Sequence, residues 1–519
     1  MFKKPLSAAL LALSLFISPA SAGVAAYSNP LDATVPQARE VRAADGAKLA
    51  FPSALGYGRF ASVGPTPTIY KVTNLNDSGT GSFRACWMAV GPRVCVFTVS
   101  GTITLTSDML ARDAQSKVYV AGQTSPGGIQ FKLGPGTTAG PFRGANGPSN
   151  VIIRFVASRP GIGHTPSTNV QGIGSIGGDY RTWNTKDIIL DHVSEQWATD
   201  EGISLAAVDN ATLQWSLQSE PIANATARGG SGTNHDYGAF LVSNNRFTVV
   251  NNLFMSGRIR NPNIAANIGD MVNNVIYNYA NNATQCYVNI KVSCVINFIS
   301  NWYSIGPRPG NMQETGQRPH CILAANEGTP APGLGHHIYV NGNICRHDLT
   351  GTDNIGKGVV YQGPGLKKPD GTTGVISTTP VHGGVNLPSW TNATTAFMNV
   401  ATFAGSIRDI HATPRRDAVD ARAVSQLRSC TGQAGSISQP PSPGYPTMTA
   451  TYTFVDNDND GMNDNWELLY KGDLSLTPHA DTDGDGWTNL EEFLNYYAGE
   501  HIVKTGVGPV PAPYCGKTP

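Results

Sequence analysis

A parallel β-helix, an all-β solenoid of stacked coils, is predicted for most of this 519-residue chain. Three observations predict it. Short β-branched runs recur at spacings of about 23 to 25 residues, or about 36 to 43 where a loop is inserted. Asparagines stand at the turns between these runs. The chain is also rich in Gly (58) and Pro (35) but only 14% charged, a balance typical of turn-rich β proteins.

The recurring unit is a short apolar run that leads into a turn. It reads VIIRFVASR at 151, IILDHVSEQW at 188, TLQWSLQSE at 212, FTVVNNLFMSG at 247, MVNNVIYNYA at 271, VINFISNWYS at 295 and IYVNGNICRH at 338. The L-x-x-L-x-L frame of leucine-rich repeats is missing. Asparagines at equivalent turns can form a ladder from coil to coil, each amide satisfying the next. The alternative is a β-sandwich, whose strands usually recur every 8 to 12 or so residues.

The domains are expected to follow one another in this order. Residues 1–22 form a signal peptide, with Lys3 and Lys4 before a short apolar run and Ala20-Ser21-Ala22 as the cleavage site. Residues 23–50 form an N-terminal arm, and 51–432 the β-helix, with a helix expected within 411–427. Residues 433–450 form a Pro/Ser/Gly linker to a C-terminal module, 451–519.

These features limit the compartment and the partners. A signal peptide without a later apolar span predicts a secreted protein, extracellular, periplasmic or attached to the surface. The 36 basic residues balance 36 acidic ones, which disfavours nucleic-acid binding. A solenoid with capped ends predicts a monomer.

Eight cysteines in an exported chain favour disulfides. Proximity pairs Cys86 with Cys95, Cys286 with Cys294, Cys321 with Cys345, and Cys430 with Cys515.

Two loops in the C-terminal module share one calcium-binding frame. Their carboxylate and amide side chains recur at positions 1, 3, 5, 9 and 12, with Gly at position 6. In the first loop these are Asp456, Asp458, Asp460, Asp464 and Glu467; in the second, Asp481, Asp483, Asp485, Asn489 and Glu492. Short alternate side chains surround Ca²⁺ with oxygen, and the final Glu supplies two oxygens. Since incoming helices are not evident, the module resembles EF-hand-like or thrombospondin-type-three calcium repeats of secreted bacterial proteins.

The central segment carries the candidate chemistry. KDIILDHVSEQWATDE (186–201) runs from an apolar strand into Asp191-His192 and ends on Asp200-Glu201, and RIRNPN (258–263) follows later. Together with FPSALGYGRFA, VTNLNDSGTGSFR and VYVAGQTSPGG, these segments make residues 51–345 similar to family-one pectate lyases and their secreted bacterial relatives. The resemblance implies a right-handed parallel β-helix, a bacterial source, and calcium-dependent β-elimination on polygalacturonate, a pectic uronate polysaccharide.

The resemblance also implies roles for individual residues. Asp179 and Asp200 match the family's calcium ligands, with Glu201 beside them, and Arg260 matches the catalytic arginine of its R-x-P motif. Three family residues are replaced here: an Asp by Ser204, a second Arg by Ala265, and a substrate-binding Lys by Tyr237. His235 and Arg258 are therefore the substrate-binding candidates. The DH pair matches a structural signature, and His192 is expected to be a buried hydrogen-bonding residue.

The chemistry also follows from the residue types. The C5 proton of a galacturonate lies next to a carboxylate, and Ca²⁺ bridging that carboxylate to Asp179 and Asp200 would stabilise the anion formed on its removal. Arg260 would either take the proton or stabilise charge while water takes it. Two alternatives stay open. A β-helix hydrolase of the polygalacturonase type would use Asp179, Asp191 and Asp200, and a non-catalytic carbohydrate-binding or adhesin solenoid would use none.

Overall fold

The structure is a computed structural model that describes residues 47–500 with gaps. The gaps are residues 146, 166–169, 178–183, 224–234, 281, 289–290, 307–320, 327–328, 347–359, 363–364, 384–390, 409–414 and 433–436. Asp179, Cys515, the predicted signal peptide and most of the predicted arm lie outside the described residues.

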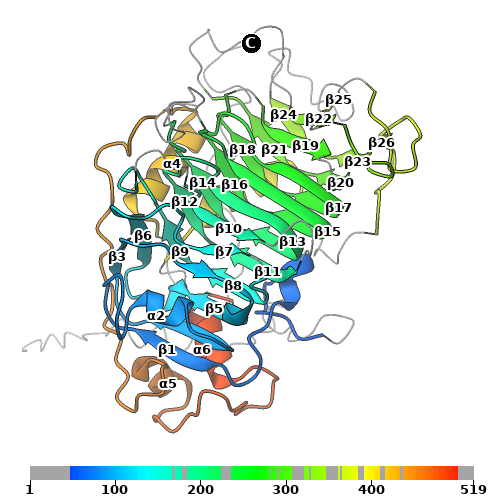
Figure 1. The fold of residues 1–519 in the computed structure, drawn as a ribbon. Coiled ribbons are helices and arrows are strands. Elements are labelled where there is room, and N and C mark those ends of the chain that lie inside the picture. Colours follow the sequence, from blue (N-terminus) through cyan, green and yellow to red (C-terminus); the bar gives the residue numbers. More distant parts are fainter. Residues whose placement is uncertain are drawn as a thin grey trace, which may run out of the picture.

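The described strands form parallel ladders that wind into a right-handed β-helix (Figure 1). One ladder contains β1 (Thr68–Val72), β2 (Arg93–Phe97), β5 (Val118–Ala121), β8 (Val151–Arg154), β11 (Thr185–Asp191), β20 (Cys294–Ile299), β23 (His336–Asn341) and β26 (Ile376–Ser377). A second contains β4 (Leu110–Ala111), β7 (Arg143–Ala145), β10 (Ile173–Gly177), β19 (Thr284–Val288), β22 (Ile322–Asn326) and β25 (Val360–Gln362). Three long strands, β13 (Ile203–Gln214), β15 (Ala239–Val250) and β17 (Asn263–Val272), belong to both ladders.

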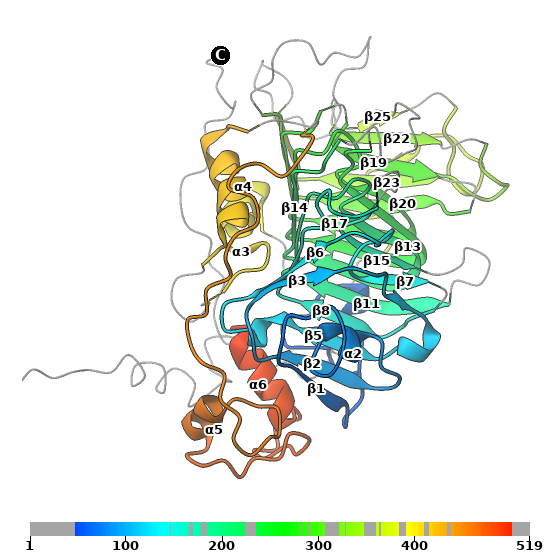
Figure 2. The same cartoon turned by 60° about the vertical axis from the view of Figure 1, so that its left-hand side comes forward.

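The third face of the β-helix is a separate sheet, to which the described part of the chain contributes nine strands. It consists of β3 (Gly101–Leu105), β6 (Ile129–Leu133), β9 (Val156–Ser158), β12 (Ser194–Gln196), β14 (Leu217–Ser219), β16 (Leu253–Met255), β18 (Val275–Tyr277), β21 (Trp302–Ser304) and β24 (Ile344–Arg346). Helices α3 (Ala393–Phe403) and α4 (Ala418–Ser429) cover its outer surface (Figure 2). The predicted helix is therefore present as α4, whereas α3 was not expected.

The repeats predicted from the sequence stack in register. Side chains at the same position of successive runs pair across the ladder and point into one apolar core. They are Leu190, Leu213, Val249, Met271, Phe298 and Val340. The fold class is therefore confirmed, and the β-sandwich alternative is wrong because every ladder among the described strands is parallel.

An asparagine ladder joins the turns of four successive coils, as the sequence predicted. The side chains of Asn252, Asn274 and Asn301 each donate from Nδ2 to Oδ1 of the next asparagine, at 2.9, 3.0 and 2.9 Å, and the series ends on Asn343. Each Oδ1 also accepts the backbone N–H of the preceding asparagine. Since these amides are nearly fully buried, the ladder supplies partners that water cannot.

We expect Asn274→Ala to lower the free energy of unfolding by about 2 to 4 kcal/mol, because it removes the acceptor of the buried Asn252 backbone N–H and the side-chain donor to the carbonyls of Val249 and Val272. Urea unfolding at saturating calcium measures this loss. Asn244→Ala is the matched control, since that exposed side chain lies outside the ladder. Equal stabilities of the two variants would show that the ladder contributes little.

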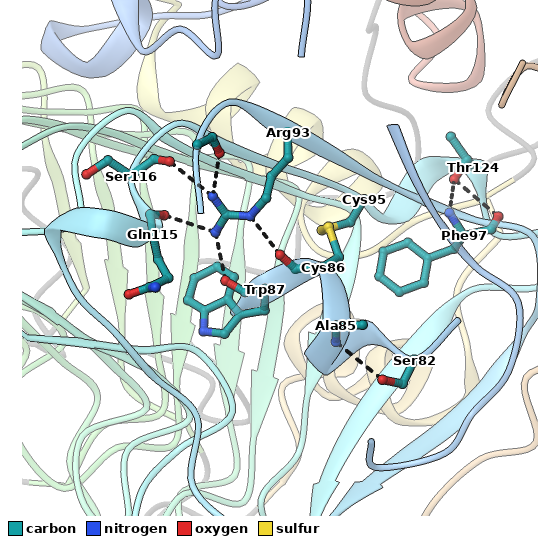
Figure 3. The surroundings of a disulfide bond; sticks show 11 residues. Ser82, Ala85, Cys86, Trp87, Arg93, Cys95, Phe97, Gln115, Ser116 and Thr124 are labelled. Atoms are coloured by element: carbon teal, nitrogen blue, oxygen red, sulfur yellow. Dashed lines mark hydrogen bonds between the residues drawn. A yellow bond between two sulfur atoms is a disulfide. The ribbon is translucent and has the colours of Figure 1, made fainter. Parts of the chain in front are cut away.

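The first coils are closed by helix α2 (Phe83–Trp87), whose aromatic side chains enter the core. The Cys86–Cys95 disulfide ties this helix to β2 (Figure 3). Arg93 is fully buried, and its guanidinium donates to backbone carbonyls, among them those of Cys86 and Trp87 at 2.7 Å. The predicted disulfides Cys86–Cys95, Cys286–Cys294 and Cys321–Cys345 are all confirmed. Since Cys515 is not described, its pairing with Cys430 stays a prediction.

The C-terminal segment carries two further helices, α5 (Asp464–Tyr470) and α6 (Asn489–Tyr497). Both lie at the end of the molecule where β1 and β5 lie, away from β24 and β25 (Figures 1 and 2). Among the described residues, none of the helices combines the length and apolar character needed to cross a membrane.

Candidate active site

The candidate residues gather because they occupy equivalent places in three successive coils. Asp200-Glu201 immediately precedes β13, His235 precedes β15, and Arg258 and Arg260 precede β17. These three strands are parallel neighbours, paired through Ile203↔Ala239 and Phe240↔Asn263. Turns that enter neighbouring parallel strands meet at one edge of a sheet. The structure therefore brings these predicted residues together, while Asp179 lies outside the described residues.

Asp200 is held by side chains on both of its oxygens. His235 Nδ1 lies 2.9 Å from Oδ1, and Gln171 Nε2 donates to Oδ2 at 3.0 Å. The carboxylate is nearly buried, with 12% of its side chain exposed. His235 thus contacts the candidate calcium ligand directly. Gln171 was not expected, and no motif in the sequence marks it.

Glu201 and Arg260 form an ion pair across the site. Burial and then the neighbouring Asp200 raise the pKa of the Glu201 carboxyl to about 7, and the Arg260 guanidinium offsets part of that effect. Asp200 and Glu201 are neighbouring buried carboxyl groups, and a divalent cation would neutralise the negative charge of their ionised forms. Their oxygen chemistry fits Ca²⁺, which prefers such ligands. Asp200 and Glu201 are thus the described residues that could hold the metal.

Tyr237 lies between the two arginines. The Arg260 guanidinium lies 4.6 Å from the centre of its ring, and that of Arg258 lies 5.5 Å from it. Arg258 also forms an ion pair with the buried Asp236, at 3.2 Å. A Cβ at Gly238 would come within 2.2 Å of the Arg260 carbonyl oxygen, so this segment can pass beneath the arginine only with glycine there. Tyr237 and Asp236 therefore orient the arginines, roles that the sequence did not reveal.

The replaced family positions lie beside this cluster. Ala265, where a second arginine was expected by resemblance, is buried in an apolar cluster with Val242 and Val292. Ser204 is also nearly buried, on β13. The cationic side of the site is therefore built from Arg258 and Arg260, with His235 nearby on Asp200.

The Asp191-His192 pair is structural and separate from the site. Asp191 is fully buried and accepts from Arg154 Nε at 2.7 Å, while His192 Nδ1 lies 2.8 Å from its other oxygen. The His192 ring stacks between Phe155 and Trp215 at the turns of neighbouring coils. The expectation that His192 is a buried hydrogen-bonding residue agrees with this geometry. Because Asp191 is committed to Arg154, it cannot act as the paired acid of a hydrolase.

Glu195 lies fully buried beneath the turn that carries Asp200 and Glu201. Its carboxyl oxygens would lie 2.0 Å from a Cβ at Gly202 and 2.3 Å from one at Gly172, and it accepts the Ala198 N–H at 3.3 Å. Burial raises the pKa of this carboxyl to about 8. Burial therefore favours the neutral form of Glu195, which supports the turn from below.

We expect Glu195→Gln to gain stability relative to the unchanged protein as the pH rises. The folded carboxyl keeps its proton to about pH 8, whereas the unfolded one loses it near its ordinary pKa of 4.5. Between these values the unfolded state binds fewer protons, so the stability of the unchanged protein falls with pH while that of the amide does not. Denaturant unfolding gives the free energy of unfolding of the variant and of the unchanged protein. The difference between the two should change by more than about 1 kcal/mol from pH 5 to pH 8. A constant difference would contradict a neutral Glu195.

The two C-terminal loops bring their predicted acidic residues together. Possible ligand atoms within 4.8 Å of one another form three groups: Asp456, Asp458 and Asp460; Asp458, Asp464 and Glu467; and Asp481, Asp483 and Asp485. Asn489 and Glu492 are buried at the start of α6. Burial and then the Asp460 charge raise the pKa of Glu467 to about 8, because converging acids disfavour each other's charged form.

Comparison with known proteins supports the pectate lyase resemblance. The protein named "Probable pectate lyase C" from Aspergillus flavus is 27% identical over 461 residues, which cover 86% of this chain and 94% of the relative. The protein of the same name from Emericella nidulans is 25% identical over 466 residues, covering 88% and 95%. These relatives confirm the predicted enzyme class, a polysaccharide lyase. No protein-family model matches the chain.

Among solved structures, "jun a 1, the major allergen from cedar pollen" covers 68% of this chain and 92% of its own, with a TM-score of 0.40 and 13% identity. That similarity is too low to carry an argument about this site.

The relatives do correct one expectation: a bacterial source was predicted, but the curated relatives are fungal, from Aspergillus and Emericella. The motifs that suggested bacterial proteins are therefore not specific to bacteria.

Proposed function

We propose that this protein is a secreted, calcium-dependent pectate lyase that cleaves polygalacturonate by β-elimination to unsaturated oligogalacturonides. The observation that supports it most directly is the grouping of Arg260, Glu201 and Asp200 at one edge of three coils. The disulfides and the signal-peptide pattern support export. As a capped solenoid, the protein is expected to act as a monomer.

The substrate would lie along this edge with its carboxylates facing the cationic side. We assign Arg258 and His235 to binding uronate carboxylates. Asp236 holds Arg258 in place at 3.2 Å, and Asp200 holds His235 at 2.9 Å. Guanidinium groups suit carboxylates because they donate in a planar fork. This arrangement orients the sugar ring before the reaction begins.

Asp200 and Glu201, with Asp179 as a further ligand, would hold Ca²⁺, which when bound withdraws charge from the uronate carboxylate and makes the C5 proton more acidic. Arg260 would stand at that proton. Tyr237 and Phe240 lie beneath its guanidinium, at 4.6 and 5.3 Å from their ring centres. Arg260 would either accept the C5 proton or stabilise the developing anion while water accepts it. In both cases the glycosidic oxygen leaves from C4 and a C4–C5 double bond forms.

The products distinguish this proposal from its alternatives. The purified protein is incubated with polygalacturonate and with methylated pectin in calcium, and the oligosaccharides are examined by mass spectrometry. Unsaturated uronides are the expected result. Saturated oligosaccharides with new reducing ends would mark a hydrolase instead, and unchanged polymer that is bound by the protein would mark a carbohydrate-binding solenoid.

A further inference from the structure

The C-terminal segment 451–500, here called the clamp, packs against the first coils of the β-helix. The outward-facing side chains of β2, β5, β8 and β11 share one apolar cluster with residues of the clamp. The β-helix contributes Val94, Val96, Tyr119, Ala121, Ile152 and Ile189, and the clamp contributes Met462, Trp466, Leu476, Leu490, Phe493 and Leu494. Both views place α5 and α6 at this end of the molecule (Figures 1 and 2). The clamp is therefore not an isolated appendage.

Polar contacts fix the clamp at the border of this cluster. Lys71 on β1 forms an ion pair with Asp456 of the first loop, at 2.7 Å. Arg154 on β8 forms a buried ion pair with Glu500, at 2.5 Å, and the same guanidinium holds Asp191. Removing one partner from a buried pair is strongly destabilising, because the other charge is then left buried alone. The end of the clamp is thus part of the internal network of the β-helix.

The first loop contains a buried carboxyl group without a hydrogen-bond partner among the described residues. Glu467 is fully buried, and among the described residues neither of its carboxylate oxygens has a hydrogen-bond partner. Its oxygens lie within 4.8 Å of the possible ligand atoms of Asp458 and Asp464. A buried carboxylate without partners is strongly unfavourable unless it takes up a proton, is paired or coordinates a metal. In the second loop the buried Asn489 Oδ1 likewise has no hydrogen-bond partner within the part of the chain that is described.

The metal ligands and the packing residues alternate on the same short helices. On α5, Glu467 follows Trp466, and on α6, Glu492 lies between Leu490 and Phe493. Whatever holds the carboxylates in place also holds these apolar side chains against the coils. Without a cation, repulsion among the acids would open the loops and draw both helices off the β-helix.

We infer that calcium bound in the two loops locks the clamp onto β2, β5, β8 and β11, so that the stability of the first coils depends on calcium. This rests on the loops binding calcium, and is independent of any metal at Asp200. It gives the C-terminal segment a role in the fold of the catalytic domain.

Hydrogen exchange followed by mass spectrometry tests this on the full chain, in calcium and after chelation. In chelator, amides of Arg93–Phe97 and Val118–Ala121 should exchange about a hundredfold faster, the effect of losing a ligand present at about a hundred times its dissociation constant. The distant Cys294–Ile299 and His336–Asn341 should not change. Faster exchange confined to 456–492, with β2 and β5 unaffected, would overturn the inference.

Glu467→Gln provides the matched variant. Asp473→Asn is the control, because Asp473 is an exposed acid between the loops that belongs to none of the three ligand groups. Terbium luminescence excited through Trp466 and Trp487 reports metal binding in the loops. The Gln variant should lose much of that signal and show rapid exchange in β2 even in calcium, while the control should match the unchanged protein. Absence of terbium binding in the unchanged protein would also overturn the inference.

Two outcomes keep this inference apart from the proposed function. Asp200→Asn should retain the calcium-dependent protection of β2 and β5. If the exchange results appear as expected but no polymer is cleaved, only the lyase proposal fails. If the polymer is cleaved while hydrogen exchange in β2 does not respond to chelator, only the inference about the clamp fails. If Glu467→Gln does not fold, hydrogen exchange of the unchanged protein in calcium and in chelator still tests the inference.

Discussion

Replacing Arg260 by Ala should lower kcat on polygalacturonate by about a thousandfold, the scale found when one group that stabilises transition-state charge is removed. Arg260 is paired with Glu201 and lies over Tyr237 and Phe240, so no other described cation has the same position. Initial rates of unsaturated product formation, measured at saturating substrate and calcium, give the change in kcat.

Arg246→Ala is the matched control for this variant. Arg246 is an exposed arginine on β15, outside the site, with its guanidinium 5.9 Å from the Tyr57 ring centre. It should retain full activity, and circular dichroism should show both variants folded. An Arg260→Ala protein within about tenfold of the unchanged kcat would remove this residue from the chemistry.

Asp200→Asn should raise the calcium concentration needed for half-maximal activity by at least about a hundredfold, because it removes a charged ligand and loosens His235, which lies 2.9 Å away. Activity measured across a calcium series separates this effect from a loss of kcat. The variant should recover part of its rate at high calcium.

Asp209→Asn is the comparison variant, since Asp209 lies farther along β13 and accepts the N–H of its neighbour Asn210. Its calcium requirement should not change. If Asp200→Asn followed the same calcium curve as the unchanged protein, Asp200 would not be a calcium ligand, and the metal would have to be held without it.

The sequence was sufficient to predict features governed by period and spacing. The recurring runs predicted the β-helix because an apolar position such as Leu190 must find its equivalent, Leu213, one coil later. The asparagine ladder followed for the same reason, since Asn252 and Asn274 occupy equivalent turns. Arg260 and Asp200 were assigned to one site by the resemblance to pectate lyases, not by the period of the runs.

Other features depend on contacts between distant parts of the chain. Gln171 meets Asp200 only after a coil is complete, and Tyr237 supports both arginines only because Gly238 lets the chain pass beneath Arg260. The packing of the clamp on Tyr119 and Ile152 joins segments more than 300 residues apart. No local pattern in the sequence indicates such contacts, which is why the sequence predicted only a C-terminal module behind a linker.

The most direct test of the account is the ultraviolet absorbance of polygalacturonate during incubation with the purified protein. The unsaturated product absorbs and the substrate does not. Calcium should start a steady rise, chelator should stop it, and renewed calcium should restore it. No rise on polygalacturonate or methylated pectin, at neutral or alkaline pH and with calcium present, would contradict the assignment of this edge as a pectate lyase site.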